Sequence, residues 1–335
     1  MSLVEFACVG ALREDYALLP TGEARLRELG GSAVYAAAGA KVWSNAVGLV
    51  ARVGANYPGE WLTKLHERGL DISGVKVLPE PQDTRAFYAY LSLEARAETD
   101  PAAHFARVGL PLPAELAGYL PPDSRPLERE KFGPLTVRPG DVPVEYLHAQ
   151  GFHFAPDEFV VHNTLPVMMR HQGIEFITCD PDARYMQPAL AEDVKQLVRG
   201  LDAFLPSEAE ARAFLGYPTG DLWPAAEAFG AMGAKIVVIK SGMHGQWVYD
   251  AEAKRKWHVP AYPAKARDVT GVGDAYCGGF LAGLARTHDP VEAAVHGAVS
   301  ASIVIEGTGA LYAFDSTPGL AQARAQALRE VVRPI

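Results

Sequence analysis

Residues 268–280, Asp-Val-Thr-Gly-Val-Gly-Asp-Ala-Tyr-Cys-Gly-Gly-Phe, place two glycines and a carboxylate where a helix is expected to begin. Gly271 and Gly273 allow a tight turn that brings backbone N–H groups against a ligand, and the following helix adds the positive end of its dipole. An apolar stripe at helical spacing predicts that helix, and its members are Cys277, Phe280, Leu281 and Leu284. The segment therefore predicts an anion site suited to phosphate.

Asp274 falls in the first turn of this expected helix. A carboxylate beside an anion site repels phosphate in the ground state, so it is better explained as a base for a substrate hydroxyl than as a phosphate ligand. A helix-capping Asp with glycines that serve a tight turn explains the same residues without any chemistry. The residues alone leave both interpretations open, because short glycine-rich matches often arise by chance.

The segment resembles the D-T-x-G-A-G-D-x-F-x-G-G-F signature of the ribokinase-like carbohydrate kinases, the PfkB family. Three positions depart from the signature without removing a functional group that the chemistry needs, namely Val269, Val272 and Tyr276. The resemblance implies that Asp274 is the catalytic base. It also implies that the backbone of Gly271, Val272 and Gly273 forms the anion hole for the transferred phosphoryl group.

Two N-terminal segments resemble the acceptor-binding motifs of the same family. Gly10-Ala-Leu-Arg-Glu-Asp15 ends on a carboxylate that would accept hydrogen bonds from sugar hydroxyls, although such an Asp taken alone is more often a solvated loop residue. Gly30-Gly31-Ser32 and the alanine-rich residues 35–40 resemble a Gly-Gly-x-x-x-Asn-x-Ala motif. Tyr35 takes the place of the Asn, so a larger phenol replaces an amide. The resemblance assigns Asp15, Gly30, Gly31 and Tyr35 to substrate binding.

Arg184 and Glu210 end two further motifs. Asp180-Pro-Asp-Ala-Arg184 resembles the family's Asp-x-Asn-x-Arg segment, and the guanidinium of Arg184 could hold a sugar acid or a phosphate in a bidentate contact. Ser207-Glu-Ala-Glu210 resembles the Asn-x-x-Glu motif that organises magnesium and its waters. Because Mg²⁺ keeps several waters, one Glu is adequate. A helix N-cap with acidic first-turn residues explains the second segment equally well.

The nucleotide side is predicted from two glycine-containing turns and one threonine. Lys240-Ser-Gly-Met-His-Gly245 follows an apolar strand and resembles the family's Thr-x-Gly-x-x-Gly turn, with Lys240 offering charge to ATP phosphates where Thr offers a hydroxyl. The turn at residues 307–310 resembles the adenine-side segment. The resemblance assigns the following residues to cofactor binding: Lys240, Gly242, Gly245, Thr270 and Gly307.

Short apolar runs alternate with helical patterns along most of the chain. The runs predict buried strands at residues 6–10, 46–53, 175–179, 203–206 and 235–239. Helical spacing predicts helices at residues 60–68, 188–199, 207–215, 224–232 and 290–305. This alternation predicts an α/β fold with a mainly parallel sheet, helices on both faces, and ligands at the carboxyl ends of the strands. The resemblance implies a single ribokinase-like three-layer sandwich over residues 1–335.

A small second sheet is expected beside the large one. Residues 84–93 are β-like and pair in our prediction with residues 15–27. The resemblance implies a lid over the substrate from segments at about 12–28 and 82–94, and a homodimer through that lid. The proline-rich residues at about 95–144 are predicted to be an insertion of loops and short helices, whose role the sequence does not indicate.

The bulk composition is that of a globular protein. With 335 residues, of which 49% are hydrophobic and 21% charged, the chain can bury one large core. A formal net charge of −9 argues against nucleic-acid or anionic-membrane surfaces. No apolar run is long enough to span a membrane, and the N-terminus lacks signal-peptide features. The three cysteines lie in apolar stretches, none paired at a metal-ligand spacing, and are expected to be reduced core residues. We therefore expect a cytoplasmic enzyme without nucleic-acid or membrane partners.

Other enzyme chemistries lack their motifs. The chain has no Gly-Lys dipeptide for a Walker A loop, no H-E-x-x-H, no G-x-S-x-G and no C-x-x-C. Tyr276 stands where a dinucleotide-binding loop would need its third glycine, so a dehydrogenase is a poorer interpretation.

The residues and the resemblance together predict a kinase that uses ATP and Mg²⁺ to phosphorylate a hydroxyl of a small sugar, sugar acid or polyol, with a monovalent cation as a further candidate cofactor. A nucleoside kinase of the same fold is the first alternative, because Tyr35 and the lid aromatics Phe87, Tyr88 and Tyr90 could stack on a base. A non-catalytic ligand sensor is the second, because Ser207 and Tyr35 depart from the family motifs.

Overall fold

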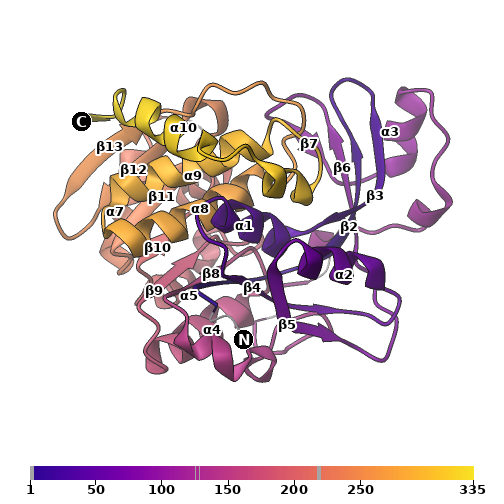
Figure 1. The fold of residues 1–335 in the computed structure, drawn as a ribbon, viewed down its shortest axis with the longest axis horizontal. Coiled ribbons are helices and arrows are strands. Elements are labelled where there is room, and N and C mark those ends of the chain that lie inside the picture. Colours follow the sequence, from indigo (N-terminus) through magenta and orange to yellow (C-terminus); the bar gives the residue numbers. More distant parts are fainter. Residues whose placement is uncertain (1–3, 125, 128, 217–219) are drawn as a thin grey trace.

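A ten-stranded sheet forms the centre of the protein (Figure 1). The computed structural model describes residues 4–124, 126–127, 129–216 and 220–335. The strands lie in the order β14 (Arg333–Pro334), β13 (Arg255–Val259), β12 (Gln246–Asp250), β11 (Ile236–Lys240), β10 (Ala203–Phe204), β9 (Phe176–Cys179), β8 (Gly151–Phe154), β1 (Phe6–Val9), β4 (Val47–Val53) and β5 (Leu70–Val77). Pairs from β5 to β11 are parallel, and those from β11 to β14 are antiparallel.

Helices cover both faces of this sheet. Successive strand residues point to opposite faces, and apolar residues lie on both. Phe6 and Cys8 belong to one apolar cluster, whereas Ala7 and Val9 belong to the other. The first cluster includes residues of α1 (Ser32–Lys41), α2 (Gly59–Glu67), α8 (Val272–Thr287), α9 (Pro290–Val304) and α10 (Leu320–Arg329). The second includes residues of α4 (Phe159–His171), α5 (Ala191–Val198), α6 (Glu208–Leu215) and α7 (Trp223–Met232). The predicted three-layer α/β arrangement is confirmed.

Each strand and helix predicted for this sandwich is present, with ends displaced by a few residues. The largest displacement is at the predicted helix 188–199, where residues Pro188–Leu190 form a 3-10 turn and α5 begins at Ala191. Strands β5, β8, β12, β13 and β14 of this sheet were not predicted. In β5 only two residues are fully buried, so the strand lacks a continuous apolar run. No helix in the described part of the chain is long and apolar enough to cross a membrane.

A second sheet of four strands stands apart from the first, formed by the segments predicted to make a lid, and is called the lid below (Figure 1). Its order is β3 (Ala24–Gly30), β2 (Arg13–Leu18), β6 (Arg85–Tyr90) and β7 (Arg96–Ala97). One face carries Tyr88 and Tyr90, which pack with Ala17 against Val269 in the turn before α8. This inner face therefore meets the segment that carries the predicted anion site.

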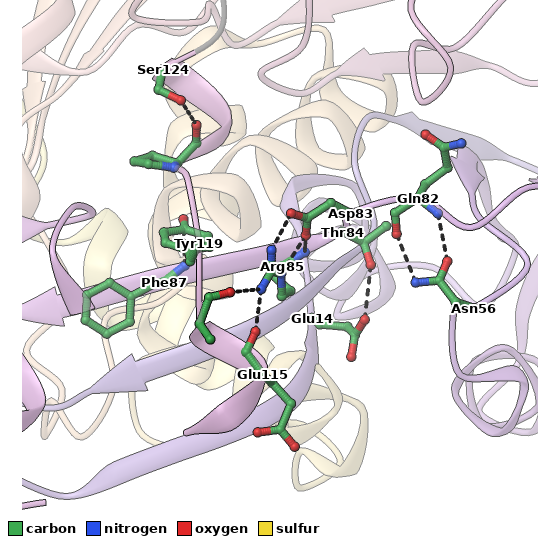
Figure 2. Close-up of polar contacts among 12 residues, drawn as sticks. Glu14, Asn56, Gln82, Asp83, Thr84, Arg85, Phe87, Glu115, Tyr119 and Ser124 are labelled. Atoms are coloured by element: carbon green, nitrogen blue, oxygen red, sulfur yellow. Dashed lines mark hydrogen bonds and ion pairs between the residues drawn. The ribbon is translucent and has the colours of Figure 1, made fainter. Parts of the chain in front are cut away.

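The proline-rich insertion covers the opposite, outer face of the lid. Helix α3 (Pro101–Arg107) contributes Phe105, and the residues after it contribute Leu116 and Tyr119 to an apolar cluster with Tyr16 and Phe87 of the lid strands. The backbone N–H of Phe87 donates to the Tyr119 hydroxyl at 3.0 Å (Figure 2). Residues 125 and 128 of the predicted insertion lie outside the described residues.

Arg85 attaches the insertion to the base of the lid (Figure 2). Its guanidinium donates to the carbonyls of Glu115 and Ala117, and it also pairs with Asp83 at 2.8 Å from Nε to Oδ1. Loops and short helices were predicted here, and the structure describes α3 and several short 3-10 turns. Of these, α3 and the turn at Ala114–Leu116 pack on the second sheet. A homodimer through this face of the lid would have to displace the chain's own insertion.

We expect the Phe105→Ala variant to lower the free energy of unfolding by about 3 kcal/mol, because it empties a fully buried position between the insertion and the lid. Urea denaturation measures the change. Leu120→Ala is the matched control, since this insertion side chain is 70% exposed, and its effect should stay within about 0.5 kcal/mol. Equal stabilities of the two variants would contradict this packing.

Candidate active site

The turn before α8 is held by a local network of hydrogen bonds. The Asp268 carboxylate accepts from the backbone N–H of Thr270 at 2.9 Å and from its hydroxyl at 2.7 Å. The Thr270 hydroxyl also lies 2.8 Å from the hydroxyl of Tyr90 on the lid. Gly271 then takes a left-handed conformation with φ of 70°, and α8 begins at Val272. Asp274 consequently lies in the first turn of α8, as predicted.

Two glycines of the predicted site lie directly against functional side chains. A Cβ on Gly271 would fall 2.0 Å from Cγ of Tyr35, so the phenol ring covers the turn. A Cβ on Gly30 would fall 1.7 Å from Oδ2 of Asp15. Neither position tolerates a side chain without displacing these groups. The structure thus brings Asp15, Gly30, Tyr35 and Gly271 together, although they lie far apart in sequence.

Asp15 is buried without a compensating partner. It is 5% exposed, and its Oδ1 has no hydrogen-bond partner in the described part of the chain. Burial raises the pKa of Asp15 to about 8, with the nearby carboxylates of Asp268 and Asp274 acting in the same direction and Arg13 opposing them. In the unliganded protein this carboxyl group is therefore mostly protonated at neutral pH.

Lys240, Asp180 and Cys277 meet beside the first turn of α8. Lys240 ends β11 and Asp180 follows β9, so both lie at the carboxyl edge of the parallel strands. The Lys240 ammonium pairs with the Asp180 carboxylate and lies 3.3 Å from the Cys277 sulfur. A Cβ on Gly273 would lie 3.9 Å from the same ammonium nitrogen. The predicted phosphate turn therefore has a largely buried cation beside it.

The carboxyl groups of this region have raised pKa values. Burial raises the pKa of Asp274 to about 6, while the positive charges of Lys240 and Arg96 act in the opposite direction. The pKa of Asp180 rises to about 6 and that of Glu210 to about 7, again mainly through burial. At neutral pH, Asp274 is thus mostly ionised and has a pKa close to the one that suits a general base.

Glu210 caps its own helix in the way that the simpler interpretation predicted. One carboxylate oxygen accepts from the backbone N–H of Ser207 at 2.7 Å, and the Ser207 hydroxyl accepts from the N–H of Glu210 at 3.3 Å. Within the described residues, no group of three or more His, Cys, Asp or Glu side chains could hold a metal ion. A role for Glu210 toward magnesium would therefore depend largely on water ligands.

Arg184 is engaged by carboxylates. Its Nε and a terminal nitrogen donate to the two oxygens of Asp182 at 2.9 and 3.0 Å, and the other terminal nitrogen donates to Glu158 at 2.9 Å. An anionic acceptor would have to compete with both carboxylates. The predicted role of Arg184 in substrate binding thus requires a rearrangement of these contacts.

The remaining nucleotide-side residues form turns at the same edge. After β11, Gly242 opens a short 3-10 turn, and the backbone N–H of Ser241 donates to the carbonyl of Gly245 at 2.8 Å. The turn that contains Gly307 follows α9, and the carbonyl of Ile305 accepts from the N–H groups of Arg267 and Asp268 at 2.8 and 3.3 Å. The Gly307 turn is thus bonded to the segment that leads into α8, and the Gly242 turn directly follows Lys240, whose ammonium lies beside Gly273.

Two residues of this site were not found by sequence reasoning. Asp180 begins the motif that ends at Arg184 and was given no role of its own, yet its carboxylate pairs with Lys240. Arg96, on β7 of the lid, lies 4.9 Å from the centre of the Tyr88 ring, and its charge acts on Asp274. No motif marks Arg96, because its place over the site depends on how the lid folds.

Comparison with known proteins agrees with this geometry. A sequence profile of the family described as pfkB family carbohydrate kinase matches residues 142–317. The chain is 29% identical to a cytidine kinase of Thermococcus kodakarensis over 286 residues, which cover 85% of this chain and 90% of the relative.

Solved structures share the fold. A putative ribokinase II from E. coli in complex with ATP and Mg²⁺ superposes with a TM-score of 0.69 at 18% identity, covering 97% of this chain and 100% of that one. Aminoimidazole riboside kinase from Salmonella enterica, complexed with aminoimidazole riboside and an ATP analogue, superposes with a TM-score of 0.66 at 15% identity, covering 96% and 99%. With the profile match, these likenesses lead to one conclusion: the chain belongs to the pfkB family of carbohydrate kinases and is a phosphotransferase.

Proposed function

We propose that the protein transfers the γ-phosphoryl group of ATP to a hydroxyl of a small sugar, sugar acid or polyol. The observation that carries this proposal is the position of Asp274 in the first turn of α8, next to a left-handed glycine turn and within the electrostatic influence of Arg96 on the lid. A helix N-terminus with a glycine turn suits an anionic group in transfer, and a carboxylate beside it suits the attacking hydroxyl.

In the proposed reaction, Asp274 takes the proton of the acceptor hydroxyl as that oxygen attacks the γ-phosphorus. The new O–P bond forms while the bond from phosphorus to the bridging oxygen breaks, and ADP leaves with the electron pair. The backbone N–H groups of Gly271, Val272 and Gly273 stabilise the charge on the transferred group. The pKa of Asp274, about 6, lets it accept the proton at neutral pH and release it afterwards.

Lys240 is proposed to bind the ATP phosphates. Its ammonium group is already desolvated beside Asp180, so ATP oxygens would share the cation with this carboxylate. The turns at Gly242, Gly245 and Gly307 and the Thr270 hydroxyl would hold the rest of the nucleotide. Magnesium, when bound, neutralises phosphate charge, and Glu210 would orient its waters through the carboxylate oxygen that does not cap α6.

The acceptor is proposed to lie between the lid and α8. Asp15 would bind its hydroxyls, because a buried carboxyl group with an unpaired oxygen lacks hydrogen-bond partners that hydroxyls supply. Gly30 keeps the space beside Asp15 free of a side chain, Gly31 packs against the backbone of residues 11–13, and Tyr35 forms a wall. Arg184 would also bind the acceptor if the acceptor carries an anionic group that displaces the carboxylate of Asp182 or Glu158 from the guanidinium.

A nucleoside kinase is the second candidate. Two observations favour it: the similarity to a cytidine kinase over most of both chains, and the tyrosine pair on the inner face of the lid. The rings of Tyr88 and Tyr90 lie with centroids 6.3 Å apart and could contact a base. A sensor without activity is disfavoured, because the family consists of phosphotransferases and Asp274 is retained.

A panel of acceptors tests the proposal and separates the two candidates. ADP release with Mg²⁺ and ATP is measured for ketoses, aldoses, sugar acids, inositols and nucleosides. Turnover on a sugar or polyol supports the proposed function, whereas turnover on nucleosides alone supports the second candidate. An absence of turnover on the whole panel, despite measurable ATP binding, would contradict both.

The Asp274→Asn variant should bind ATP with an affinity within about threefold of the wild type and lose turnover by about 10²–10⁴-fold, because the amide cannot take the proton. Glu292→Gln is the matched control, since this carboxylate lies in the first turn of α9, away from the site. Retained turnover in Asp274→Asn would exclude its assignment as the base.

The Asp15→Asn variant should change how stability depends on pH. Because the pKa of Asp15 rises from 3.8 to about 8 in the folded state, folding retains a proton that the unfolded chain releases. This residue therefore makes the wild type less stable as pH rises from about 4 to 8, by at most about 1.4 kcal/mol per pH unit. Urea denaturation at pH 5, 6 and 7 should show a flatter dependence for the variant.

The control for this experiment is Asp315→Asn, because the Asp315 side chain is 67% exposed and pairs with Arg68 at the surface. Its free energy of unfolding should change with pH in the same way as that of the wild type. If the free energy of unfolding of Asp15→Asn showed the same pH dependence as that of the wild type, a raised pKa of Asp15 would be excluded.

A further inference from the structure

Tyr57 carries a second buried oxygen without a partner near Asp15. The residue lies between β4 and α2 and is 6% exposed, and its hydroxyl has no hydrogen-bond partner in the described part of the chain. Burial raises the pKa of Tyr57, and among the charges that act on it the Asp15 carboxylate is the strongest. Asp15 pairs with Ala86 of β6, and Asn56, the neighbour of Tyr57 in sequence, is hydrogen-bonded to Gln82 just before that strand. Tyr57 and Asp15 therefore lie on adjoining segments.

An unpaired buried hydroxyl destabilises a protein, because the group loses its hydrogen bonds to water and gains none in exchange. A phenylalanine at position 57 would fill the same space without that cost. Neither the fold nor the packing of the ring calls for the oxygen of Tyr57. A buried polar group without a partner calls for an explanation, and a ligand that completes its hydrogen bonds is one.

The position of Tyr57 is fixed by its neighbours. Its ring packs edge-on against Trp61 with centroids 5.5 Å apart, and its backbone N–H donates to the carbonyl of Gly54 at 3.0 Å. The adjacent Asn56 side chain donates to the carbonyl of Gln82 at 3.0 Å and accepts from its N–H at 2.8 Å (Figure 2). Gln82 precedes lid strand β6, so the loop that carries Tyr57 is tied to the base of the lid.

We propose that Tyr57 is an acceptor-binding residue whose hydroxyl, together with the Asp15 carboxyl group, binds two adjacent hydroxyls of the acceptor. The inference rests on the proposed function. The phenol donates to one acceptor oxygen, and Asp15 accepts from the neighbouring hydroxyl. Both protein oxygens are shielded from solvent in this arrangement, so the acceptor reaches them when the lid moves away from the site. The pair selects acceptors with a vicinal diol over their deoxy analogues.

The test compares wild type, Tyr57→Phe and Tyr276→Phe. Tyr276 is the matched control, because its hydroxyl is also buried without a partner but its ring packs against Gly297 of α9. The probes are D-ribose and cytidine with their 2-deoxy and 3-deoxy analogues, and the readouts are kcat and KM for acceptor and ATP, together with the thermal stability of the unliganded proteins.

For Tyr57→Phe we expect an unchanged or raised Tm, an acceptor KM raised about tenfold, and an ATP KM within twofold of the wild type. The preference for the diol over one deoxy analogue should shrink by a similar factor. Tyr276→Phe should leave all kinetic constants unchanged.

Unchanged acceptor KM in an active Tyr57→Phe protein would overturn the assignment, and so would a Tm several degrees below the wild type, since the hydroxyl would then be structural. A wild type that is inactive on every acceptor would overturn the assignment together with the proposed function. Activity in the wild type with no effect of Tyr57→Phe would overturn the assignment alone.

Discussion

The direct contact between α1 and α8 is the constraint on which the rest of the site depends. A Cβ on Gly39 would fall 1.8 Å from the carbonyl oxygen of Ala275, and one on Gly278 would fall 1.8 Å from that of Ala36. The two helices therefore pack backbone against backbone, which larger residues would prevent. Because α1 begins after the acceptor-side glycines and α8 after the phosphate-side turn, this contact holds the two halves of the site together and lays Tyr35 over Gly271.

Electrostatics then determines what this assembled site can do. The carboxyl edge of the sheet collects several acids around one buried lysine, and burial raises the pKa of Asp15, Asp180, Glu210 and Asp274. An unliganded site of this kind holds more protons than isolated carboxyl groups would. In the proposed reaction, incoming hydroxyls, phosphates and cations would supply the missing partners, among them those of the unpaired oxygens of Asp15 and Tyr57.

Local features were predictable from the sequence, and contacts between distant segments were not. Short apolar runs predicted most of the buried strands, and apolar residues at helical spacing predicted the helices. The glycine turn before α8 predicted that Asp274 lies in the first turn of that helix. Half-exposed β5 lacks such a run and was missed. The carboxylates around Arg184, the pairing of Asp180 with Lys240, and the cover that Phe105 and Tyr119 give the lid all depend on tertiary folding. No local pattern encodes them.

In the proposed mechanism, Asp274 is an ionised carboxylate that takes the acceptor's proton, and the decisive experiment is the pH dependence of wild-type kcat/KM for the acceptor. Since the pKa of Asp274 is raised to about 6, we expect kcat/KM to rise about tenfold per pH unit below that value and to level off above it. Stability is measured at each pH, so that unfolding is not mistaken for a loss of catalysis. A kcat/KM that stays constant between about pH 5 and 8 in the folded enzyme would exclude Asp274 as the base.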